Sequence, residues 1–454
     1  MDLEFARKRC LDSLIWAMTE LKGQINMTQL ENSAELIIQT MSGPWRYFHT
    51  PEHIFEVGGS VDPIEVLAAL FHDLVYVQVD RGVNLNISSY ISPFVKEVRG
   101  QLVIREENEL PNSLMFDIVT AIFGFFPAQS LSPFAGQNEF LSAVVAAISL
   151  EHFLPPSIIA KIAACIEATI PFRPKQPSGL TASDLLADRM KATNQKFNLG
   201  WSETETLEAV KRAVRLGNRD VENFAYPNSA DFLDNTWNLM PETNHELSNA
   251  NSYTVVGYRK SMQKMEGFMN FLQPELVFQH FMGEPDDNHY NQLITRTKKN
   301  LDVARLYLGI KLIAIAILEA LSYRLGRDIP VSTMMGELPT PGVTTPVLEQ
   351  FLPDIPTSYP PETTLESEVL DLLSKGRTRD SAYDIKNSPI ATFVIKSIGF
   401  ASAKHLIQRS KDFFAGNITA EEFLAECDPQ VVKTVTDGVW QLFESRKLTL
   451  RVVK

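Results

Sequence analysis

The sequence predicts an all-α protein. Apolar residues recur at three- and four-residue steps over most of the chain, which places them on one face of a helix. Strand-like alternation is scarce, and a run such as 252–256 is short and isolated. The helical spacing is clearest, in chain order, at 11–21, 144–153, 158–169, 205–216, 258–271, 294–323 and 400–414.

Four regions are expected along the chain, because 454 residues exceed the size at which a single hydrophobic core usually stops growing. A first helical domain at 1–250 is followed by additional helices at 251–335 that pack on its core. The segment 336–364 is rich in proline, which cannot continue a helix, and is expected to be a linker. Helical periodicity resumes at 365–454, which predicts a small C-terminal helical domain.

The composition is typical of a globular protein in a reducing compartment. Hydrophobic residues make up 44% of the chain and charged residues 21%, which excludes a disordered chain. The three cysteines, Cys10, Cys165 and Cys427, are widely separated and form no Cys-x-x-Cys pair. The N-terminal segment lacks the apolar core of a secretory signal. We therefore expect a cytoplasmic location.

Charge and hydropathy restrict the partners. The net charge of −13 argues against a surface for long nucleic acids, which requires clustered lysine and arginine. The most apolar stretch, 306–321, is interrupted by Lys311 and Glu319, whereas a membrane-spanning helix needs roughly 18 uncharged residues. We expect a buried core helix there and no membrane association. The sequence gives no indication of the oligomeric state.

Two short histidine-containing strings carry most of the chemical information. The first, FHTPEH, places His49 and His53 four residues apart, which is one face of a helix if the segment is helical. The second, LFHD, ends an apolar run with His72 and Asp73. Imidazole and carboxylate are metal ligands in hydrolytic sites, and a buried charge needs a partner or a metal. Each string alone is also typical of hydrogen-bonded core residues, but together they predict a metal site.

At these strings the chain resembles the HD-domain metal-dependent phosphohydrolases, an all-helical superfamily that includes the cyclic-nucleotide phosphodiesterases. An uncharacterised bacterial branch has the pattern aromatic-His-Asn-x-x-His-Ile, followed about twenty residues later by Ala-x-x-Phe-His-Asp-x-x-Tyr. Residues 47–54 read YFHTPEHI and residues 69–76 read ALFHDLVY. The resemblance covers about 40–245 and implies that the first domain is an HD-like helical bundle, with the remaining helices C-terminal to it.

The resemblance implies a role for each matching side chain. In the phosphodiesterases the first histidine of the His-x3-His string is the proton donor, and the second is a metal ligand. This makes His49 the candidate general acid. It makes His53, His72 and Asp73 candidate ligands of a divalent metal ion, which could be Mn, Mg, Zn or Fe.

A distant aspartate is implied as the fourth ligand, and two segments compete for this role. Asp220 lies in an Asp-x-x-Asn string that matches the phosphodiesterases, and it follows the helix predicted at 205–216. Asp184 or Asp188 lies closer to where small bacterial relatives keep an Asp-Leu pair. We favour Asp220 and leave the other two open.

Four further side chains are candidates for substrate binding or catalysis. Arg173 and Lys175 follow the helix predicted at 158–169 and could meet the negative charge that develops on a phosphate. Tyr76 occupies the position at which the phosphodiesterases have a histidine that helps bind a second metal. We expect Tyr76 to be a substrate-binding residue. Glu167 is a candidate catalytic residue that orients a ligand or a water. The alternative is that Glu167 pairs with a lysine and that the two basic residues merely solvate a loop.

The resemblance implies a metal-dependent hydrolase of phosphoric ester bonds. A metal lowers the pKa of its bound water toward about 7, and a histidine can protonate the leaving alkoxide. The expected substrate is a phosphomonoester or phosphodiester of a small molecule or nucleotide. Two alternatives stay open: a regulatory HD scaffold that holds a metal and engages a partner, and an HD-like di-iron oxygenase.

Overall fold

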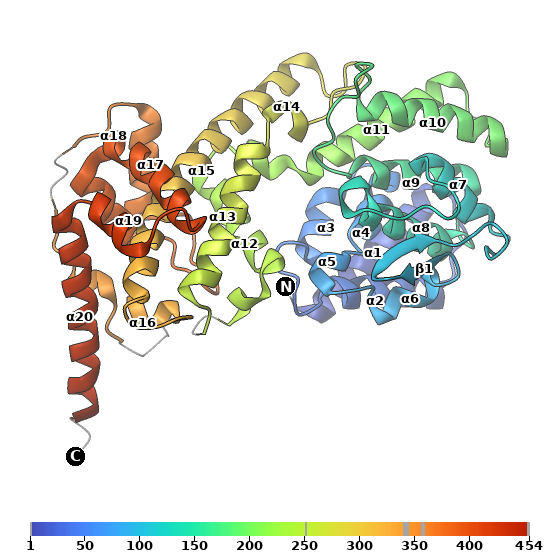
Figure 1. The fold of residues 1–454 in the computed structure, drawn as a ribbon. Coiled ribbons are helices and arrows are strands. Elements are labelled where there is room, and N and C mark those ends of the chain that lie inside the picture. The colour runs from blue at the N-terminus through green and yellow to red at the C-terminus, as the bar shows by residue number, and fades with distance from the viewer. Residues whose placement is uncertain (1, 250–251, 339–344, 356–358, 452–454) are drawn as a thin grey trace. The chain divides into compact units, whose positions relative to one another are not determined.

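The computed structural model describes residues 2–249, 252–338, 345–355 and 359–451, with the backbone alone from 446 onward. Helices dominate these residues (Figure 1). Apart from isolated bridges, their β-structure is one antiparallel hairpin in which Val95 pairs with Ile104. The predicted all-α class is therefore confirmed.

The chain divides into two compact units, and each unit is built from two separate segments. Unit 1 comprises Met1–Phe224 and Gln273–Thr295, and unit 2 comprises Ala225–Leu272 and Arg296–Lys454. This division differs from the boundary that we expected at 250, because the chain enters unit 2 earlier and later returns to unit 1. Parts of the expected linker, 339–344 and 356–358, lie outside the described residues.

Polar contacts over long sequence distances lie within each unit. The backbone N–H of Gln279 donates to Asn218 Oδ1 at 2.7 Å, and its side-chain Nε2 donates to the carbonyl of Ala168 at 2.7 Å, both within unit 1. Within unit 2, Trp237 Nε1 donates to Asp384 Oδ2 at 2.8 Å. The hydropathy pattern does not reveal such contacts. The regions predicted from the sequence therefore contain only segments that are neighbours along the chain.

Helix α9 (Pro156–Ala168) is the central helix of unit 1. It packs against α4, α7, α8, α10 and α11, and its residues from Ile162 to Ala168 are all buried. A helix that is apolar on nearly all sides is stable only inside a core. Around it, in chain order, are α1 (Leu3–Glu20), α2 (Met27–Met41), α3 (Pro51–Gly58), α4 (Pro63–His72), α5 (Val77–Asp80), α6 (Leu85–Ile91), β1 (Val95–Val98), β2 (Gln101–Ile104), α7 (Leu114–Phe123), α8 (Gln137–Leu150), α10 (Ala182–Phe197), α11 (Glu203–Asp220) and α14 (Pro274–Val277).

Unit 2 contains most of the longest helix, α15 (Asp287–Ser322), which begins in unit 1. The apolar stretch 306–321 is buried in it, as expected of a core helix. In α15, Gly309 leaves room for Ile407, whose Cδ1 would lie 2.8 Å from an added Cβ. The other helices of unit 2 are α12 (Ser229–Thr243), α13 (Val255–Phe271), α16 (Val331–Met335), α17 (Thr364–Lys375), α18 (Pro389–Phe414), α19 (Ala420–Glu426) and α20 (Pro429–Arg451).

Within the described residues, α18 is the one helix that is long and apolar enough to cross a membrane. Its most apolar stretch is 56% buried inside the protein, and Gly399 interrupts it with a non-helical backbone (φ 73°, ψ 165°). A kinked and largely buried helix of this kind is typical of a protein core.

A close approach between α9 and α11 fixes the position of the C-terminal end of α11. Gly217 lies against the last turn of α9, where an added Cβ would stand 2.5 Å from the carbonyl oxygen of Ala168. Only glycine allows this approach without a shift of one backbone. Asp220 follows three residues later, so the approach also determines where its carboxylate lies.

Three ion pairs hold α11 in register with the segment that begins α4. Arg212 Nε lies 2.7 Å from Asp62 Oδ2, and Arg215 Nε lies 3.1 Å from Glu65 Oε1. Arg219 pairs with the second oxygen of Glu65. Because Glu65 is buried, removing either arginine would leave part of a buried charge without a partner, which is costly.

The variant Gly217→Ala tests the close approach. On an ordinary helix, alanine is more stable than glycine by up to about 1 kcal/mol. At this position we expect the reverse, a loss of about 1–3 kcal/mol in the free energy of unfolding, because overpacking against a backbone oxygen dominates. The matched control is Gly267→Ala in α13, where an added Cβ meets no atom within 4 Å. Urea unfolding measures both, and equal stabilisation of both proteins would contradict the assignment.

Candidate metal centre

The first histidine string is divided by the start of a helix. Pro51 occupies the first turn of α3, where its missing N–H and fixed φ are suited to a helix start. His53 therefore lies in α3, whereas His49 precedes it, so the two do not share a helix face. Their rings nevertheless remain close, with centroids 5.7 Å apart.

The second string ends α4. His72 is the last residue of α4, and Asp73 is its C-cap with φ −106° and ψ 13°. His72 Nδ1 lies 2.8 Å from the carbonyl oxygen of Ala69, and because a carbonyl only accepts, Nδ1 carries the proton of this hydrogen bond. This bond orients the ring and leaves Nε2 to face the other ligand candidates.

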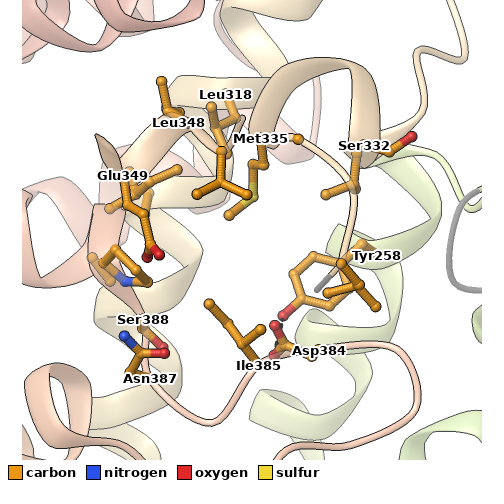
Figure 2. Close-up of a pocket in the computed structure, with 18 of the residues that line it drawn as sticks. Tyr258, Leu318, Ser332, Met335, Leu348, Glu349, Asp384, Ile385, Asn387 and Ser388 are labelled. Atoms are coloured by element: carbon orange, nitrogen blue, oxygen red, sulfur yellow. Dashed lines mark hydrogen bonds between the residues drawn. The ribbon is translucent and has the colours of Figure 1, made fainter. Parts of the chain in front are cut away.

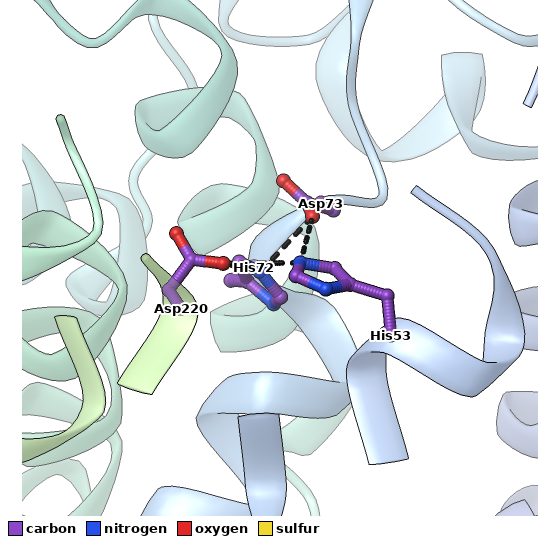
Figure 3. Close-up of side chains that lie close together, drawn as sticks. All are labelled: His53, His72, Asp73 and Asp220. Atoms are coloured by element: carbon purple, nitrogen blue, oxygen red, sulfur yellow. Dashed lines mark hydrogen bonds and ion pairs between the residues drawn. The ribbon is translucent and has the colours of Figure 1, made fainter. Parts of the chain in front are cut away.

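Four side chains converge in unit 1, as Figure 3 shows: His53, His72, Asp73 and Asp220. His53 Nε2 lies 3.0 Å from Asp220 Oδ1 and 3.4 Å from Asp73 Oδ2. His72 Nε2 lies 3.2 Å from Asp220 Oδ1 and 3.0 Å from Asp73 Oδ2. One ligand atom from each residue lies within 4.8 Å of the other three, so the group could hold a metal ion.

The donor set suits a divalent cation. Asp73 Oδ2 is buried and has no hydrogen-bond partner of acceptable geometry among the described residues, although two imidazole nitrogens lie close to it. A buried carboxylate oxygen of this kind is costly unless a cation satisfies it. Two carboxylates and two neutral imidazoles carry a charge of about −2, which a divalent ion neutralises, and mixed nitrogen and oxygen donors suit zinc, manganese or iron.

The ionisation of the four groups is strongly coupled. Burial disfavours the imidazolium of His53, but the hydrogen bonds and charges of Asp220 and Asp73 outweigh it and raise its pKa to about 9. The pKa of His72 is likewise raised by the two carboxylates against the effect of burial. Burial disfavours the carboxylate of Asp220, but the charges and hydrogen bonds of His72 and His53 lower its pKa to about 2, and the pKa of Asp73 is lowered for related reasons.

These shifts make the stability of the metal-free protein depend on pH. The raised pKa of His53 contributes stability that is complete below the ordinary value of 6.5 and is lost as the pH rises through about 9. The lowered pKa of Asp220 contributes stability that is complete above 3.8 and is lost as the pH falls through about 2. The metal-free cluster therefore stabilises the fold most between about pH 4 and 6.5.

A buried arginine fixes the backbone of the metal-binding turn. The side chain of Arg46 is fully buried and makes a bidentate pair with Asp80, at 2.9 and 2.7 Å. Its Nη1 also donates to the carbonyl oxygen of Asp73 at 2.9 Å. Arg46 thus links the turn after α4 to α5. Sequence reasoning missed Arg46, because its partners lie 27 to 34 positions away in the chain.

The structure brings Asp220 to the histidines and leaves the two competing aspartates elsewhere. Asp184 caps α10, where its Oδ2 accepts from the backbone N–H of Thr181 at 2.8 Å and from its hydroxyl at 2.6 Å. Asp188 is exposed on the same helix. Neither belongs to the group that could hold a metal.

The predicted substrate-binding and catalytic residues have different environments. Buried Glu167 pairs with two arginines rather than a lysine: Arg173 Nη1 donates to its Oε1 at 2.6 Å, and Arg189 binds the same oxygen. Lys175 is exposed. The ring of Tyr76 packs edge-on against His49 with centroids 4.7 Å apart. Arg219, next to the candidate ligand Asp220, pairs with Glu65.

His49 lies beside the four-residue group without belonging to it. Its ring contacts those of Phe48 and Tyr76, and its charge contributes to lowering the pKa of Asp73. An imidazole next to a metal group, but outside its ligand set, is close enough to act on a substrate bound there. The proton-donor role stays a prediction.

Glu139 is a site residue that sequence reasoning missed. It lies in the first turn of α8, between Asn138, which accepts from Val77 N–H at 3.2 Å, and Ser142, which accepts from Val75 N–H at 3.0 Å. Glu139 Oε2 is buried with no hydrogen-bond partner among the described residues. Burial, and to a lesser extent the charges of Asp73 and Asp220, raise its pKa to about 7. It lies before the helical spacing predicted at 144–153, and no local motif distinguishes it.

Comparisons with known proteins do not assign this site to a family. No protein-family model matches the chain, and searches of the curated proteins and of the solved structures find no match. The resemblance to HD-domain phosphohydrolases therefore rests on the strings at 47–54 and 69–76, and membership of that superfamily stays a prediction.

Proton release on metal binding tests the centre. A ligating imidazole must be neutral at the bound nitrogen, so a metal displaces protons from His53 and His72, whose pKa values are raised. We expect the apparent affinity for Zn²⁺ to rise from pH 6 to 8 by up to about tenfold per pH unit for each displaced proton. Calorimetry in two buffers of different ionisation enthalpy counts these protons.

Exposed His152 supplies the control for this experiment. Its side chain is 68% exposed and lies outside the group, so His152→Gln should bind Zn²⁺ with an unchanged pH dependence. His53→Gln should weaken binding and release fewer protons. An affinity of the wild-type protein that does not change with pH would contradict the ligand assignment.

Proposed function

We propose that the protein is a metal-dependent hydrolase that cleaves a phosphomonoester or phosphodiester of a small molecule or nucleotide. The observation that carries this proposal is the group of two imidazoles and two carboxylates with a third imidazole, that of His49, beside it. Hydrolysis of a phosphoric ester needs an activated water, a charge-stabilising centre and a proton for the leaving group. The described residues include candidates for each.

The ligands would be His53, His72, Asp73 and Asp220, held by the contacts described above. A bound divalent cation would supply Lewis acidity toward a phosphoryl oxygen and lower the pKa of a coordinated water toward about 7. Metal analysis decides between zinc, manganese, magnesium and iron, although two histidine ligands favour zinc or iron over magnesium.

His49 would deliver the proton to the leaving oxygen. Histidine is the side chain best suited to proton transfer near neutral pH, and such transfer contributes roughly a hundred- to ten-thousand-fold to the rate. The edge-on contact with Tyr76 and the contact with Phe48 hold the ring in one orientation. Tyr76 then acts as a positioning residue for the acid and borders the substrate.

Glu139 would accept the proton of the attacking water. Its buried oxygen lacks a donor among the described residues, so it is available to a water molecule. A carboxyl group that titrates near neutral pH can change protonation during turnover. The hydrogen bonds of Asn138 and Ser142 to the chain just beyond Asp73 keep this turn of α8 beside the metal group.

Arg173 would supply positive charge to the phosphate. Its Nε is buried without a hydrogen-bond partner among the described residues, and its charge acts on Glu139. Glu167 holds the guanidinium through three oxygen atoms. Arg173 Nη1 donates to Glu167 Oε1, and Arg173 Nη2 donates to Glu167 Oε2 at 3.3 Å and to the backbone carbonyl of Glu167 at 3.2 Å. This supports a positioning role for Glu167 instead of direct catalysis. Exposed Lys175 would add only long-range attraction.

Substrates with different leaving groups separate the roles. Metal-loaded wild-type protein should hydrolyse p-nitrophenyl phosphate or bis(p-nitrophenyl) phosphate, and also a nucleotide such as 5′-AMP or cyclic AMP. In His49→Ala the rate on the nucleotide should fall about a hundredfold or more, because an alkoxide needs a proton. The rate on the nitrophenyl ester should fall far less, because nitrophenolate leaves without one. Metal content should be unchanged.

Asp73→Asn is the matched variant for metal binding. It should lose both the metal and all hydrolysis, whereas His49→Ala loses only the reaction that needs an acid. Equal losses on both substrates would remove the acid assignment. No turnover by metal-loaded wild type on either ester class or on a panel of nucleotides would overturn the proposed function.

The variant Glu139→Gln tests the base. It is nearly isosteric, so metal content should stay within a few-fold of wild type while kcat/KM falls about a hundredfold. Wild-type kcat/KM should rise with pH up to about 7, because the carboxylate is the active form, and this limb should disappear in the variant. Loss of metal in Glu139→Gln would instead make it a ligand.

A further inference from the structure

Unit 2 contains a partly open cavity of about 320 Å³ that the proposed hydrolase does not use. All the residues that line it belong to unit 2, and Figure 2 shows the labelled ones around a common space. Apolar side chains, including Leu318, Met335 and Leu348, lie on one side. Polar groups, including Asp384 and Asn387, lie on the other. The volume corresponds to roughly ten water molecules, within the range of small-molecule sites.

The buried charges at the polar side are already paired. Lys311 Nζ lies 3.0 Å from Asp384 Oδ2, which also accepts from Tyr258 at 2.7 Å and from Trp237 at 2.8 Å. The ammonium of Lys311 further faces the ring of Trp237, 5.1 Å from its centroid. This pair therefore presents no net charge to a ligand, and its hydrogen bonds make the polar wall rigid.

Glu349 also lines the cavity, beside the apolar wall, but its charge is not paired in this way. Figure 2 shows its carboxylate at the cavity, next to Leu348, and the residue as a whole is exposed. Among the described residues no cation pairs with Glu349, and no hydrogen bond engages its side chain. Glu337, on the same rim, adds a second negative charge. The unpaired charge of the lining is thus negative and adjoins the apolar wall.

We propose that this cavity binds a small organic cation, an amine or quaternary ammonium group carried on an apolar body. The cation would lie at Glu349, and the body would lie against Leu318, Met335 and Leu348. Charge complementarity selects this class over an organic acid, since the single ammonium in the lining is already paired with Asp384. The apolar wall selects an amphiphile over a small hydrophilic cation.

The charge of Glu349 gives the site its selectivity. Glu349 is an exposed residue at the rim of the cavity, and its partial burial raises the pKa of the carboxyl without enclosing it. A ligand cation at hydrogen-bond distance would gain a charge interaction with this carboxylate, whereas a neutral analogue would gain none and an anion would be repelled. The site and its ligand class are independent of the hydrolase reaction, because the lining shares no residue with the metal group.

Three probes of equal chain length test the proposal: octylamine, 1-octanol and octanoate. They are added to the full-length protein labelled with ¹³C at the methionine methyl groups, and the Met335 signal is identified from Met335→Leu. Octylamine should shift this signal and bind most tightly. Octanol should bind about fivefold more weakly, the factor expected from a charge interaction of about 1 kcal/mol. Octanoate should bind most weakly.

Variants separate the charge from the cavity. Glu349→Gln should reduce the affinity for octylamine about fivefold to that of octanol and leave octanol unchanged. Glu97→Gln, an exposed carboxylate on β1 of unit 1, should change neither. Met335→Trp and, independently, Ile385→Trp should fill the cavity and abolish binding of both probes, and their folding is checked by thermal unfolding.

Three results would overturn the proposal. Octanoate binding as tightly as octylamine would show that an anion is preferred. An unchanged octylamine affinity in Glu349→Gln would remove the role of the carboxylate. An unshifted Met335 signal at saturating octylamine would show that the probe does not enter the cavity.

Discussion

The organisation of unit 1 depends on bringing two largely buried carboxylates together. Asp73 and Asp220 repel each other unless positive charge lies between them, and burial makes the repulsion stronger. In the metal-free protein His53 and His72 provide that charge, as their raised pKa values indicate. A divalent cation could replace two protons at the same place. The centre is thus stable only with protons or with a metal.

Several features of unit 1 oppose the repulsion by holding the chain around it. The contact of Gly217 with the last turn of α9 and the arginine pairs of Glu65 keep α11 in place. On the other side, Arg46 binds the carbonyl of Asp73. These groups lie outside the candidate ligand set, yet they decide where the ligands stand. Buried polar groups in unit 2 follow a different principle, because Lys311 and Asp384 neutralise each other within the protein.

Local patterns predicted the helices and part of the site, and the reason is that both depend on near neighbours. Apolar spacing is sufficient to predict α9 or α11, and the histidine strings are contiguous. A local Asp-x-x-Asn string favoured Asp220 over Asp184, but whether Asp220 reaches the histidines depends on how α11 packs on α3 and α4, which no local string states. Glu139 and Arg46 were missed for the same reason, since their meaning comes from partners far away in the sequence. The division into units does not follow linear boundaries because segment 273–295 returns to unit 1, where Gln279 makes polar contacts and Phe281 joins the hydrophobic core.

The return of that segment has a consequence for the order of folding during synthesis. A ribosome releases residues in sequence, at about 5–20 per second, and N-terminal regions begin to fold first. When residues 1–224 have emerged, the side chain of Asn218 and the carbonyl of Ala168 still lack their contacts with Gln279. A stretch of unit 2 must emerge before these contacts can form. The nascent chain therefore carries an unfinished first unit while the second has already begun, and completion of one is tied in time to the growth of the other.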